Sequence, residues 1–305
     1  MENQTPTIES TLKSMDTEEP IDIYFYRPIG YRVALLAEKL GITPNAITIA
    51  SIFLGIGAGI CFYFGNIWIS LLGIFLLIWA NSFDSADGQL ARMTKQYSPI
   101  GRALDGFAGD LWFASIYIAI CLRLYPVWGS WIWLLAIVAG YFHSKQASMA
   151  DYYRNIHLLF LKGKNGSELD NSEELTQQYK EETLKHNWFN KIYLFFYRSY
   201  TQGQENWTPS FQTMFAVLRA QFGETPPQSF REAFRAKSLP LMKYTNILSF
   251  NTRAIVLFIS ILVGQPWIYF VFELTVLNIL LGYMVLTHEK YCKEFTKEIE
   301  NDKFK

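Results

Sequence analysis

Long apolar runs constrain this chain more than any other feature of its sequence. A helix needs about 20 predominantly apolar residues to cross the hydrocarbon core of a bilayer. The chain is 50% hydrophobic and 18% charged, whereas soluble domains are about 25% charged. We therefore predict an all-α, polytopic membrane bundle of six transmembrane helices. The predicted spans are residues 46–64, 67–83, 107–125, 128–144, 239–264 and 267–287.

The segments before the first span divide into a tail and a helix. Residues 1–20 are polar and rich in Thr, Ser and Glu, which is typical of a disordered N-terminal tail. Residues 21–40 mix apolar side chains with charged ones, which suits a helix lying in the lipid headgroups or a soluble amphipathic helix. Because a span follows directly, we predict an interfacial helix, and we group it with transmembrane helices 1–4 as residues 21–146.

A long polar segment separates the fourth and fifth predicted spans. Residues 147–238 far exceed the usual connection between helices of a bundle, so we predict a large, helical, cytoplasmic insert. Its aromatic part, Trp188 to Tyr197, is flanked by basic residues and fits two alternatives: another surface-lying helix, or a helix packed against the cytoplasmic ends of the bundle. The last two spans then occupy residues 239–288, and residues 289–305 form a cytoplasmic tail.

Lysine and arginine predict the orientation of the spans. Six spans place both chain ends, the segment 84–105 and the segment after 144 on one side of the membrane. By the positive-inside rule this side is cytoplasmic, because the opposite side has Arg123 alone. The basic residues on the cytoplasmic side are Lys39, Arg92, Lys95, Arg102, Lys145, Arg253, Lys290 and Lys293. We expect a multi-pass integral membrane protein, of the inner membrane if the chain is bacterial. The formal net charge of zero gives no reason to expect a nucleic-acid partner.

Carboxylates are concentrated between the second and third spans, in the stretch NSFDSADGQLARMTKQYSPIGRALDGFAGD, residues 81–110. Its first part is spaced so that two acids, two small residues and a cation share one face of a helix. These residues are Asp84, Asp87, Gly88, Ala91 and Arg92. Gly101 and Asp105 repeat the four-residue spacing at the expected start of the next helix.

Two facing helices would bring Asp84, Asp87 and Asp105 together. Ionised carboxylates at such short range repel one another, so a cluster of this kind normally holds divalent cations through its oxygens. Three solvated acids in a membrane-surface loop are the alternative. The small residues on the same face favour a ligand site, because they leave room for a bulky ligand to approach the backbone.

This stretch resembles the signature of the CDP-alcohol phosphotransferase family, D-x2-D-G-x2-A-R-x8-G-x3-D-x3-D. Every spacer matches over the first seven fixed positions. They are Asp84, Asp87, Gly88, Ala91, Arg92, Gly101 and Asp105. The motif TPNxxT, from Thr43 to Thr48, is also similar to the entry of the family's first membrane helix. Independently of the resemblance, Thr43 is a good N-cap and Pro44 a good first helical residue.

The resemblance implies a metal-dependent transferase of phospholipid biosynthesis. Such an enzyme transfers a phosphatidyl or substituted phosphoryl group from a CDP-alcohol, here expected to be CDP-diacylglycerol, to an alcohol acceptor, and it releases CMP. Two divalent cations, Mg²⁺ or Mn²⁺, would be held by the aspartates and would bridge the pyrophosphate. The small residues Gly88, Ala91 and Gly101 would line the substrate-binding site. Arg92 would contact a phosphate of the substrate or else pair with a carboxylate. The family also suggests a homodimer.

The chain departs from the family signature at the fourth acid. The family has an aspartate where this sequence has Gly109, and Asp110 follows one residue late. On a regular α-helix the fourth residue after Asp105 lies about 40° from it and the fifth about 140°. A π-bulge would bring Asp110 into line. We therefore predict Asp110 as a fourth metal ligand and as the base in place of the family's fourth acid, with Asp105 as the other catalytic acid.

The acceptor is left open by the sequence. An acidic acceptor such as inositol phosphate needs further cations, and Lys145, Arg154 and Arg253 are available on the predicted cytoplasmic side, although orientation alone also demands basic residues there. Inositol, glycerol phosphate and serine are further candidates, as is the reverse pairing of CDP-choline or CDP-ethanolamine with a lipid alcohol. Lys145 and Arg253 are predicted as substrate-binding residues.

Two other classes of protein compete with this interpretation. An intramembrane prenyltransferase also uses aspartate-bound magnesium and pyrophosphate, but it needs a second aspartate-rich motif, and the later spans offer only Glu273. A catalytically decayed membrane scaffold would explain the displaced fourth acid. Decay should loosen the whole signature, whereas only one position has moved.

Overall fold

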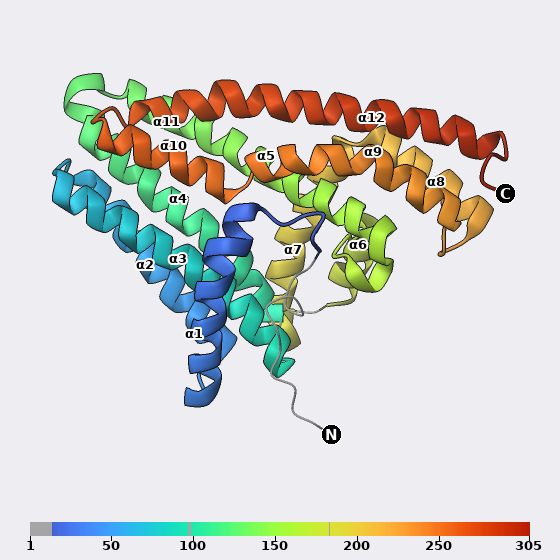
Figure 1. Cartoon of the computed structure of the whole chain (residues 1–305), viewed down its shortest axis with the longest axis horizontal. Helices are drawn as coiled ribbons and strands as arrows, with labels where there is room; N and C mark the ends of the chain where they lie inside the picture. The colour runs from blue at the N-terminus through green and yellow to red at the C-terminus, as the bar shows by residue number, and fades with distance from the viewer. Residues whose placement is uncertain (1–13, 97–98, 183) are drawn as a thin grey trace. The chain divides into compact units, whose positions relative to one another are not determined.

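The computed structural model of the chain describes residues 14–96, 99–182 and 184–305. Within these residues the regular structure is entirely helical, which confirms the predicted all-α class (Figure 1). The chain forms two compact units. The first combines Met1–Phe142 with Arg253–Leu274, and the second combines His143–Thr252 with Thr275–Lys305.

Five helical segments among the described residues are long and apolar enough to cross a membrane. They are Pro44–Tyr63, Ile67–Thr94, Leu104–Trp128, Gln228–Leu262 and Trp267–Glu300. This supports a multi-pass membrane protein, but the predicted count of six is not confirmed. The predicted span 128–144 falls largely in α5 (Trp131–Lys162), whose apolar beginning soon gives way to polar residues around Lys145.

Local sequence signals set the starts of the first two long helices. Helix α2 (Pro44–Tyr63) begins as predicted, because the Thr43 side chain accepts a hydrogen bond from the Ala46 N–H at 3.4 Å. Helix α3 (Ile67–Thr94) begins after Asn66, whose Oδ1 accepts from the N–H of Trp68 at 2.9 Å. The turn between them uses Gly65 at φ 68°, a backbone conformation that L side chains rarely adopt.

Glycines allow α2 to lie very close to its two neighbours. A Cβ at Gly55 would be 2.1 Å from the Trp112 ring of α4 (Pro99–Trp128), and one at Gly59 would be 2.3 Å from Ser115 Oγ of the same helix. On the other neighbour, a Cβ at Gly73 of α3 would lie 2.7 Å from the Phe62 ring of α2. Small residues four apart are typical of close helix pairs in membranes, where packing rather than water exclusion drives association.

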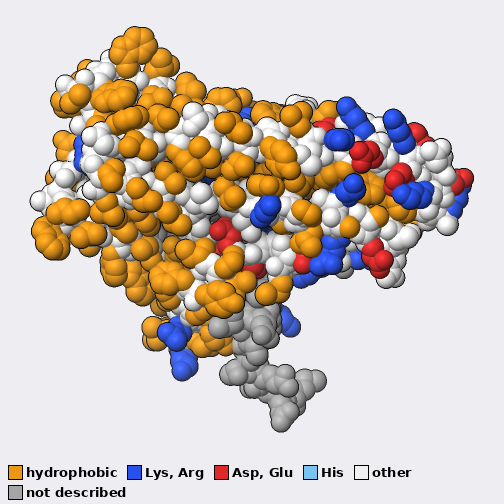
Figure 2. Space-filling model, turned by 45° about the horizontal axis from the view of Figure 1, so that its top comes forward, with side chains coloured by type: hydrophobic (Ala, Val, Ile, Leu, Met, Phe, Trp, Pro, Cys, Tyr) orange, Lys and Arg blue, Asp and Glu red, His pale blue; other side chains and the backbone are white. Residues whose placement is uncertain are grey.

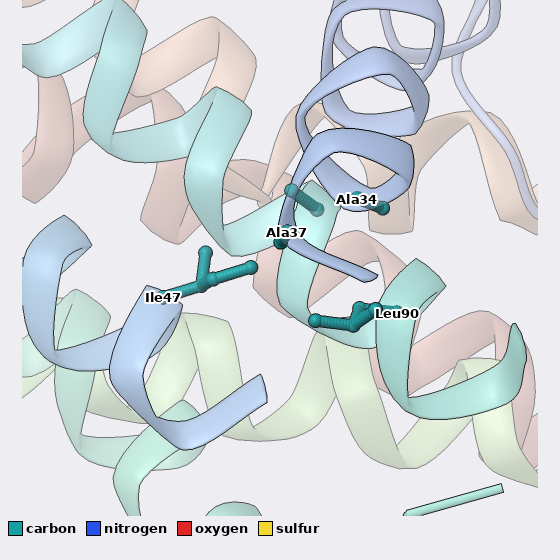
Figure 3. Close-up of a cluster of buried hydrophobic side chains, with 5 residues drawn as sticks. Ala34, Ala37, Ile47 and Leu90 are labelled. Atoms are coloured by element: carbon teal, nitrogen blue, oxygen red, sulfur yellow. The ribbon is translucent and has the colours of Figure 1, made fainter. Parts of the chain in front are cut away.

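A short π-helix, η2 (Asp22–Tyr26), and α1 (Arg27–Leu40) pack on α3. Figure 3 shows the contact, in which Ala34 and Ala37 of α1 lie near Ile47 of α2 and Leu90 of α3. The small alanines let the helices approach closely, while Leu36 and Leu40 on α1 are exposed. The helix therefore has one packed side and one apolar exposed side, which is the pattern that an interfacial helix needs.

The first unit also contains a buried polar network. Arg253 of α10 (Phe250–Leu262) forms an ion pair at 2.5 Å with Glu273, which follows α11 (Trp267–Phe272) at the start of the π-helix η4 (Glu273–Leu277). Tyr269 donates to Glu273 at 2.7 Å, and Tyr117 of α4 donates to its other carboxylate oxygen. Because the acid has three partners, its burial is compensated, and the network ties α4 to α10 and α11.

The second unit is built largely from the predicted insert and the end of the chain. After the 3₁₀ turn η3 (Lys164–Gly166), the insert forms α6 (Ser172–Glu181), α7 (Leu184–Asn206), α8 (Pro209–Phe222) and the first half of α9 (Gln228–Ile247). Helix α12 (Asn278–Glu300) packs against α8 and α9 and continues through most of the predicted tail 289–305.

Aromatic side chains form the core of this second unit. Phe295, which lies in the predicted tail, packs against Phe230 and Phe234 of α9 with ring centroids 5.4 and 5.8 Å apart. Glu289 accepts a hydrogen bond from the Ser210 N–H at 2.6 Å and so caps α8. The insert and the end of the chain thus share one hydrophobic core.

The surface of the molecule is largely apolar. Figure 2 shows hydrophobic side chains over most of the visible face, with charged side chains gathered where α8, α9 and the end of α12 lie. Exposed ion pairs occur there, including Lys237 with Glu294 at 3.9 Å and Lys303 with Glu298 at 2.7 Å. A surface of this kind suits a protein that is mostly embedded in lipid, with a water-exposed end on its second unit.

The predicted disordered tail, 1–20, lies mostly outside the described residues. Its last part, from Ser14 onward, forms a turn in which the Thr17 N–H donates to the Ser14 carbonyl at 3.2 Å. Glu18 then accepts two hydrogen bonds from Arg27 at 2.8 and 3.0 Å. These contacts fix the chain just before η2.

Replacing Gly55 by alanine is expected to destabilise the first unit by about 1–3 kcal/mol, because the added methyl group would overlap Trp112 and force α2 away from α4. Thermal unfolding of the purified protein in detergent measures the effect. Gly57→Ala is the matched control, since its Cβ would meet only Leu76 at an ordinary 3.5 Å. Equal melting temperatures for the two variants would contradict the close approach.

Candidate metal centre

Three carboxylates converge where α3 and α4 meet. Asp84 and Asp87 lie near the end of α3, and Asp105 lies near the start of α4. Each offers one carboxylate oxygen to a group in which all the oxygens lie within 4.8 Å of one another. The structure thus brings together the three acids that the sequence analysis placed on two facing helices.

The backbone of α3 positions the first two acids. A spacing of three residues puts Asp84 and Asp87 on the same side of the helix. The helix ends after Thr94 at Lys95, which adopts a left-handed conformation at φ 55° and donates its N–H to the Ala91 carbonyl. This C-cap turns the chain toward α4, so the next helix can return Asp105 to the same place.

Asp87 is held by a partner from a different helix. The Thr48 hydroxyl of α2 donates to Asp87 Oδ2 at 2.5 Å, and both residues are buried, Asp87 with an exposed fraction of 5%. A buried carboxylate is stable only with strong hydrogen bonds or opposite charge nearby. Thr48 therefore fixes the orientation of the Asp87 carboxylate.

The N-terminal segment braces the acid-bearing end of α3. Tyr26 hydrogen-bonds with the side chain of Asn81, and Gln89 Nε2 donates to the Arg27 carbonyl at 3.2 Å. Burial raises the pKa of the Tyr26 hydroxyl, and the bond to Asn81 opposes part of that shift. A Cβ at Gly30 would lie 2.9 Å from Gln89 Nε2, so α1 contacts this end of α3 closely.

Two arginines provide positive charge near the acids. Arg27 interacts electrostatically with Asp84, and Arg92 does so with Asp87. The terminal nitrogens of Arg92 lie 3.4 Å from the position that a Cβ would take at Gly88. The guanidinium thus lies beside Gly88, and Arg92 is on the same face as the acids, as its spacing predicted.

The three acids fit a divalent-cation site by both chemistry and access. Their oxygens are close enough for shared ligation, and hard cations such as Mg²⁺ prefer carboxylate oxygens. Asp87 is buried, Asp84 is partly buried and Asp105 is exposed, so the cluster can be reached from outside the bundle. Ala91 and Gly101, both small, are partly exposed on the same two helices.

Asp110 is not part of this group. Helix α4 is α-helical over its whole length, Pro99–Trp128, so the predicted π-bulge is wrong. A regular helix turns Asp110 about 140° away from Asp105. The residue is exposed, and the group of acids found among the described residues consists of Asp84, Asp87 and Asp105. One inserted residue in the signature has therefore moved the fourth acid to another face of α4.

The two basic residues predicted to bind substrate have other surroundings. Arg253 has an exposed fraction of 1% and is engaged by Glu273, which does not fit direct contact with a soluble substrate. Lys145 belongs to the second unit, where its Nζ lies 3.4 Å from the position of a Cβ at Gly203 of α7. Arg154 donates to Ser249 Oγ at 3.0 Å in the same unit.

Sequence reasoning missed two contributors to the site. The bond from Thr48 to Asp87 joins residues 39 positions apart, and the position of Thr48 in the TPNxxT motif was the only signal for it. The polar contacts of η2 and α1 with α3 gave no periodic signal, since they use the Arg27 backbone carbonyl and the Tyr26 side chain. Both depend on how three helices meet in space.

Comparison with known proteins agrees with this geometry. Residues 41–153 match the CDP-alcohol phosphatidyltransferase family, which confirms the resemblance noted in the sequence. A 120-residue segment is also 33% identical to the archaetidylinositol phosphate synthase of Pyrococcus horikoshii. The similar segment covers 39% of this chain and 61% of that protein. The family match runs from the end of α1 into α5 and so contains the whole acid cluster.

Replacing Thr48 by valine is expected to weaken Mn²⁺ binding about tenfold, because Asp87 loses the hydrogen bond that orients it. Thr48→Ser keeps the hydroxyl and should bind as the unaltered protein does. Electron paramagnetic resonance titration of free Mn²⁺ measures the affinity without any need for activity.

The control for that titration is Thr94→Val. The Thr94 hydroxyl donates to the Leu90 carbonyl of its own helix, at 2.8 Å. Its replacement therefore removes a comparable hydroxyl from α3 but no hydrogen bond to a carboxylate of the cluster. Unchanged Mn²⁺ affinity in Thr48→Val would show that Thr48 does not orient a metal ligand.

Proposed function

We propose that the protein is an integral membrane CDP-alcohol phosphotransferase of phospholipid synthesis. One observation carries the proposal: Asp84, Asp87 and Asp105 meet within 4.8 Å in the part of the chain that matches the family. A pyrophosphate-linked substrate is an anion, and an acid cluster can bind it only through cations. The fit of the three carboxylates to divalent cations therefore supports this class of reaction.

Each residue of the site would have a separate role. Asp84, Asp87 and Asp105 would hold two divalent cations, Mg²⁺ or Mn²⁺, which supply positive charge to the pyrophosphate and to the departing CMP. Thr48 would keep Asp87 oriented. Arg92, at the same face, would make a charge-assisted contact with a phosphate oxygen of the substrate.

The reaction joins an acceptor alcohol to the lipid phosphate. The hydroxyl oxygen of the acceptor attacks the phosphorus next to the lipid, the bond from that phosphorus to the bridging oxygen breaks, and CMP leaves with the electron pair. The hydroxyl proton passes to a carboxylate. Asp105 is the better placed base, because it is exposed and belongs to the cluster, whereas Asp110 lies on another face of α4.

We further propose CDP-diacylglycerol or a similar CDP-linked lipid as donor and an inositol phosphate as acceptor. The name of the P. horikoshii relative, archaetidylinositol phosphate synthase, motivates the choice of acceptor. Free inositol is the second candidate. Arg253 is engaged by Glu273, so it is left out of the proposed acceptor site.

The charge distribution supports a cytoplasmic site. Arg92 and Lys95 lie at the acid-bearing end of α3, which the positive-inside rule places at the cytoplasmic surface. CDP-activated substrates are made on that side.

A prenyltransferase is less well supported. Its second acidic motif would have to include Glu273, and that residue is engaged by Arg253, Tyr117 and Tyr269. Across the described ranges, the acids close enough for shared metal ligation are those of the signature.

Purified protein in detergent micelles is expected to release CMP from CDP-diacylglycerol when inositol 1-phosphate and Mg²⁺ are present. Chelation with EDTA should abolish the release, and Mn²⁺ should restore it, because the pyrophosphate charge is otherwise not neutralised. Radiolabelled acceptors offered one at a time identify the alcohol. Folded protein that binds Mn²⁺ but releases no CMP with any acceptor would favour the scaffold alternative.

Asp105→Asn should lower CMP release by on the order of 100-fold or more, since it removes a metal ligand and the proposed base. Asp110→Asn should retain most of the activity, because Asp110 is outside the cluster. Mn²⁺ titration of both variants distinguishes the loss of a metal ligand from the loss of the catalytic base. An inactive Asp110→Asn variant that still binds Mn²⁺ would assign the base to Asp110 and would require α4 to rearrange during the reaction.

A further inference from the structure

Helix α7 exposes a continuous apolar face in the second unit, outside the part of the chain that matches the family. Its exposed side chains are large and mostly aromatic, with exposed fractions as high as 63% at Trp188 and 59% at Phe196. The face consists of Trp188, Phe189, Ile192, Phe195, Phe196 and Tyr200. We call it the α7 apolar face.

Helical geometry separates this face from the side of α7 that packs. At about 100° per residue, the six residues fall within one sector of about 140°, while Leu194 and Thr201 point to the opposite side and Gln204 lies just beyond the edge of the sector next to Tyr200. Those three are buried, and Gln204 Nε2 donates to the Ser148 carbonyl of α5 at 2.9 Å. The helix is thus anchored through the side that carries these three residues, and the α7 apolar face is exposed within the part of the chain that the structure describes.

All the charged residues of α7 before its last turn are basic. From Leu184 to Tyr200 the sequence contains Lys185, Lys191 and Arg198 but no Asp or Glu. Arg198 lies over the Tyr179 ring of α6 at 4.2 Å, and Lys191 lies over the same ring at 4.8 Å. Both cations are therefore held at the border between the α7 apolar face and α6. The chain as a whole has a net charge of zero, so this positive segment is a local feature.

The neighbouring helix α6 has the opposite character. It carries Glu173, Glu174 and Glu181, and Gln177 and Lys180 are exposed on it. Two adjacent helices of one unit thus differ sharply. Helix α6 is suited to contact with water, whereas α7 is suited to a boundary between an apolar phase and a layer of negative charge. The headgroup region of an anionic lipid leaflet has both properties.

We propose that α7 lies in the headgroup region of an anionic leaflet with its apolar face inserted. Trp and Tyr are favoured at this depth, and Lys and Arg next to such a face meet lipid phosphates. The occupant of the α7 apolar face is thus the same bilayer that the spanning helices cross. This proposal does not depend on the reaction proposed above.

Photocrosslinking tests the proposal directly. p-Benzoylphenylalanine in place of Phe196 keeps an aromatic side chain, and the full-length protein is reconstituted in nanodiscs of mixed phosphatidylglycerol and phosphatidylcholine. Mass spectrometry then identifies the adduct. The same probe at Gln177 on α6 is the matched control, and at Phe53, exposed on α2 within a candidate span, it is the positive control.

The probe at position 196 is expected to give on the order of tenfold more lipid adduct than at position 177, because insertion by about 5–10 Å removes it from water. Phosphatidylglycerol should be enriched in the adduct over its share of the nanodisc, owing to Lys191 and Arg198. Adducts to a second copy of the chain, or lipid adducts no more frequent than at position 177, would overturn the proposal. Equal capture of both lipids would overturn its anionic part.

Discussion

The close approach of α2 to α3 and α4 is the constraint on which the rest of the structure depends. Gly55 and Gly59 leave room for the side chains of Trp112 and Ser115, and Gly73 leaves room for the Phe62 ring, so three long apolar helices pack closely. In a bilayer such contact replaces the hydrophobic effect as the source of helix association. The same closeness lets Thr48 of α2 reach Asp87 of α3, and α3 with α4 brings Asp105 to the other two acids.

The acid cluster and the buried network around Glu273 show two ways to keep a carboxylate inside a membrane bundle. Glu273 is satisfied internally by an arginine and two tyrosines, so nothing further is needed for its stability. Asp84, Asp87 and Asp105 have mutual repulsion instead, partly offset by Arg27 and Arg92. Because of that difference, the Glu273 network ties helices together, whereas the cluster of Asp84, Asp87 and Asp105 suits a divalent-cation site.

The second unit adds features that the matched family region lacks. Its core joins the insert to the end of α12, because Phe230 and Phe234 pack against Phe295. This packing joins α9 to the C-terminal helix α12, which also packs against α8, and the same unit presents two very different surfaces, the polar α6 and the aromatic α7.

The sequence by itself determined the helical class, the start of α2 at Thr43 and the shared face of Asp84, Asp87 and Arg92, because these follow from apolar run length, capping chemistry and the 3.6-residue period. It could not determine that Arg253 would be engaged by Glu273, since that contact joins helices through packing rather than through spacing. It also allowed a π-bulge before Asp110 that α4 does not contain, because only the folded helix shows whether an inserted residue is absorbed by a bulge. The tertiary structure decided which acids meet, since a spacing fixes the face of one helix and only packing fixes what that face contacts.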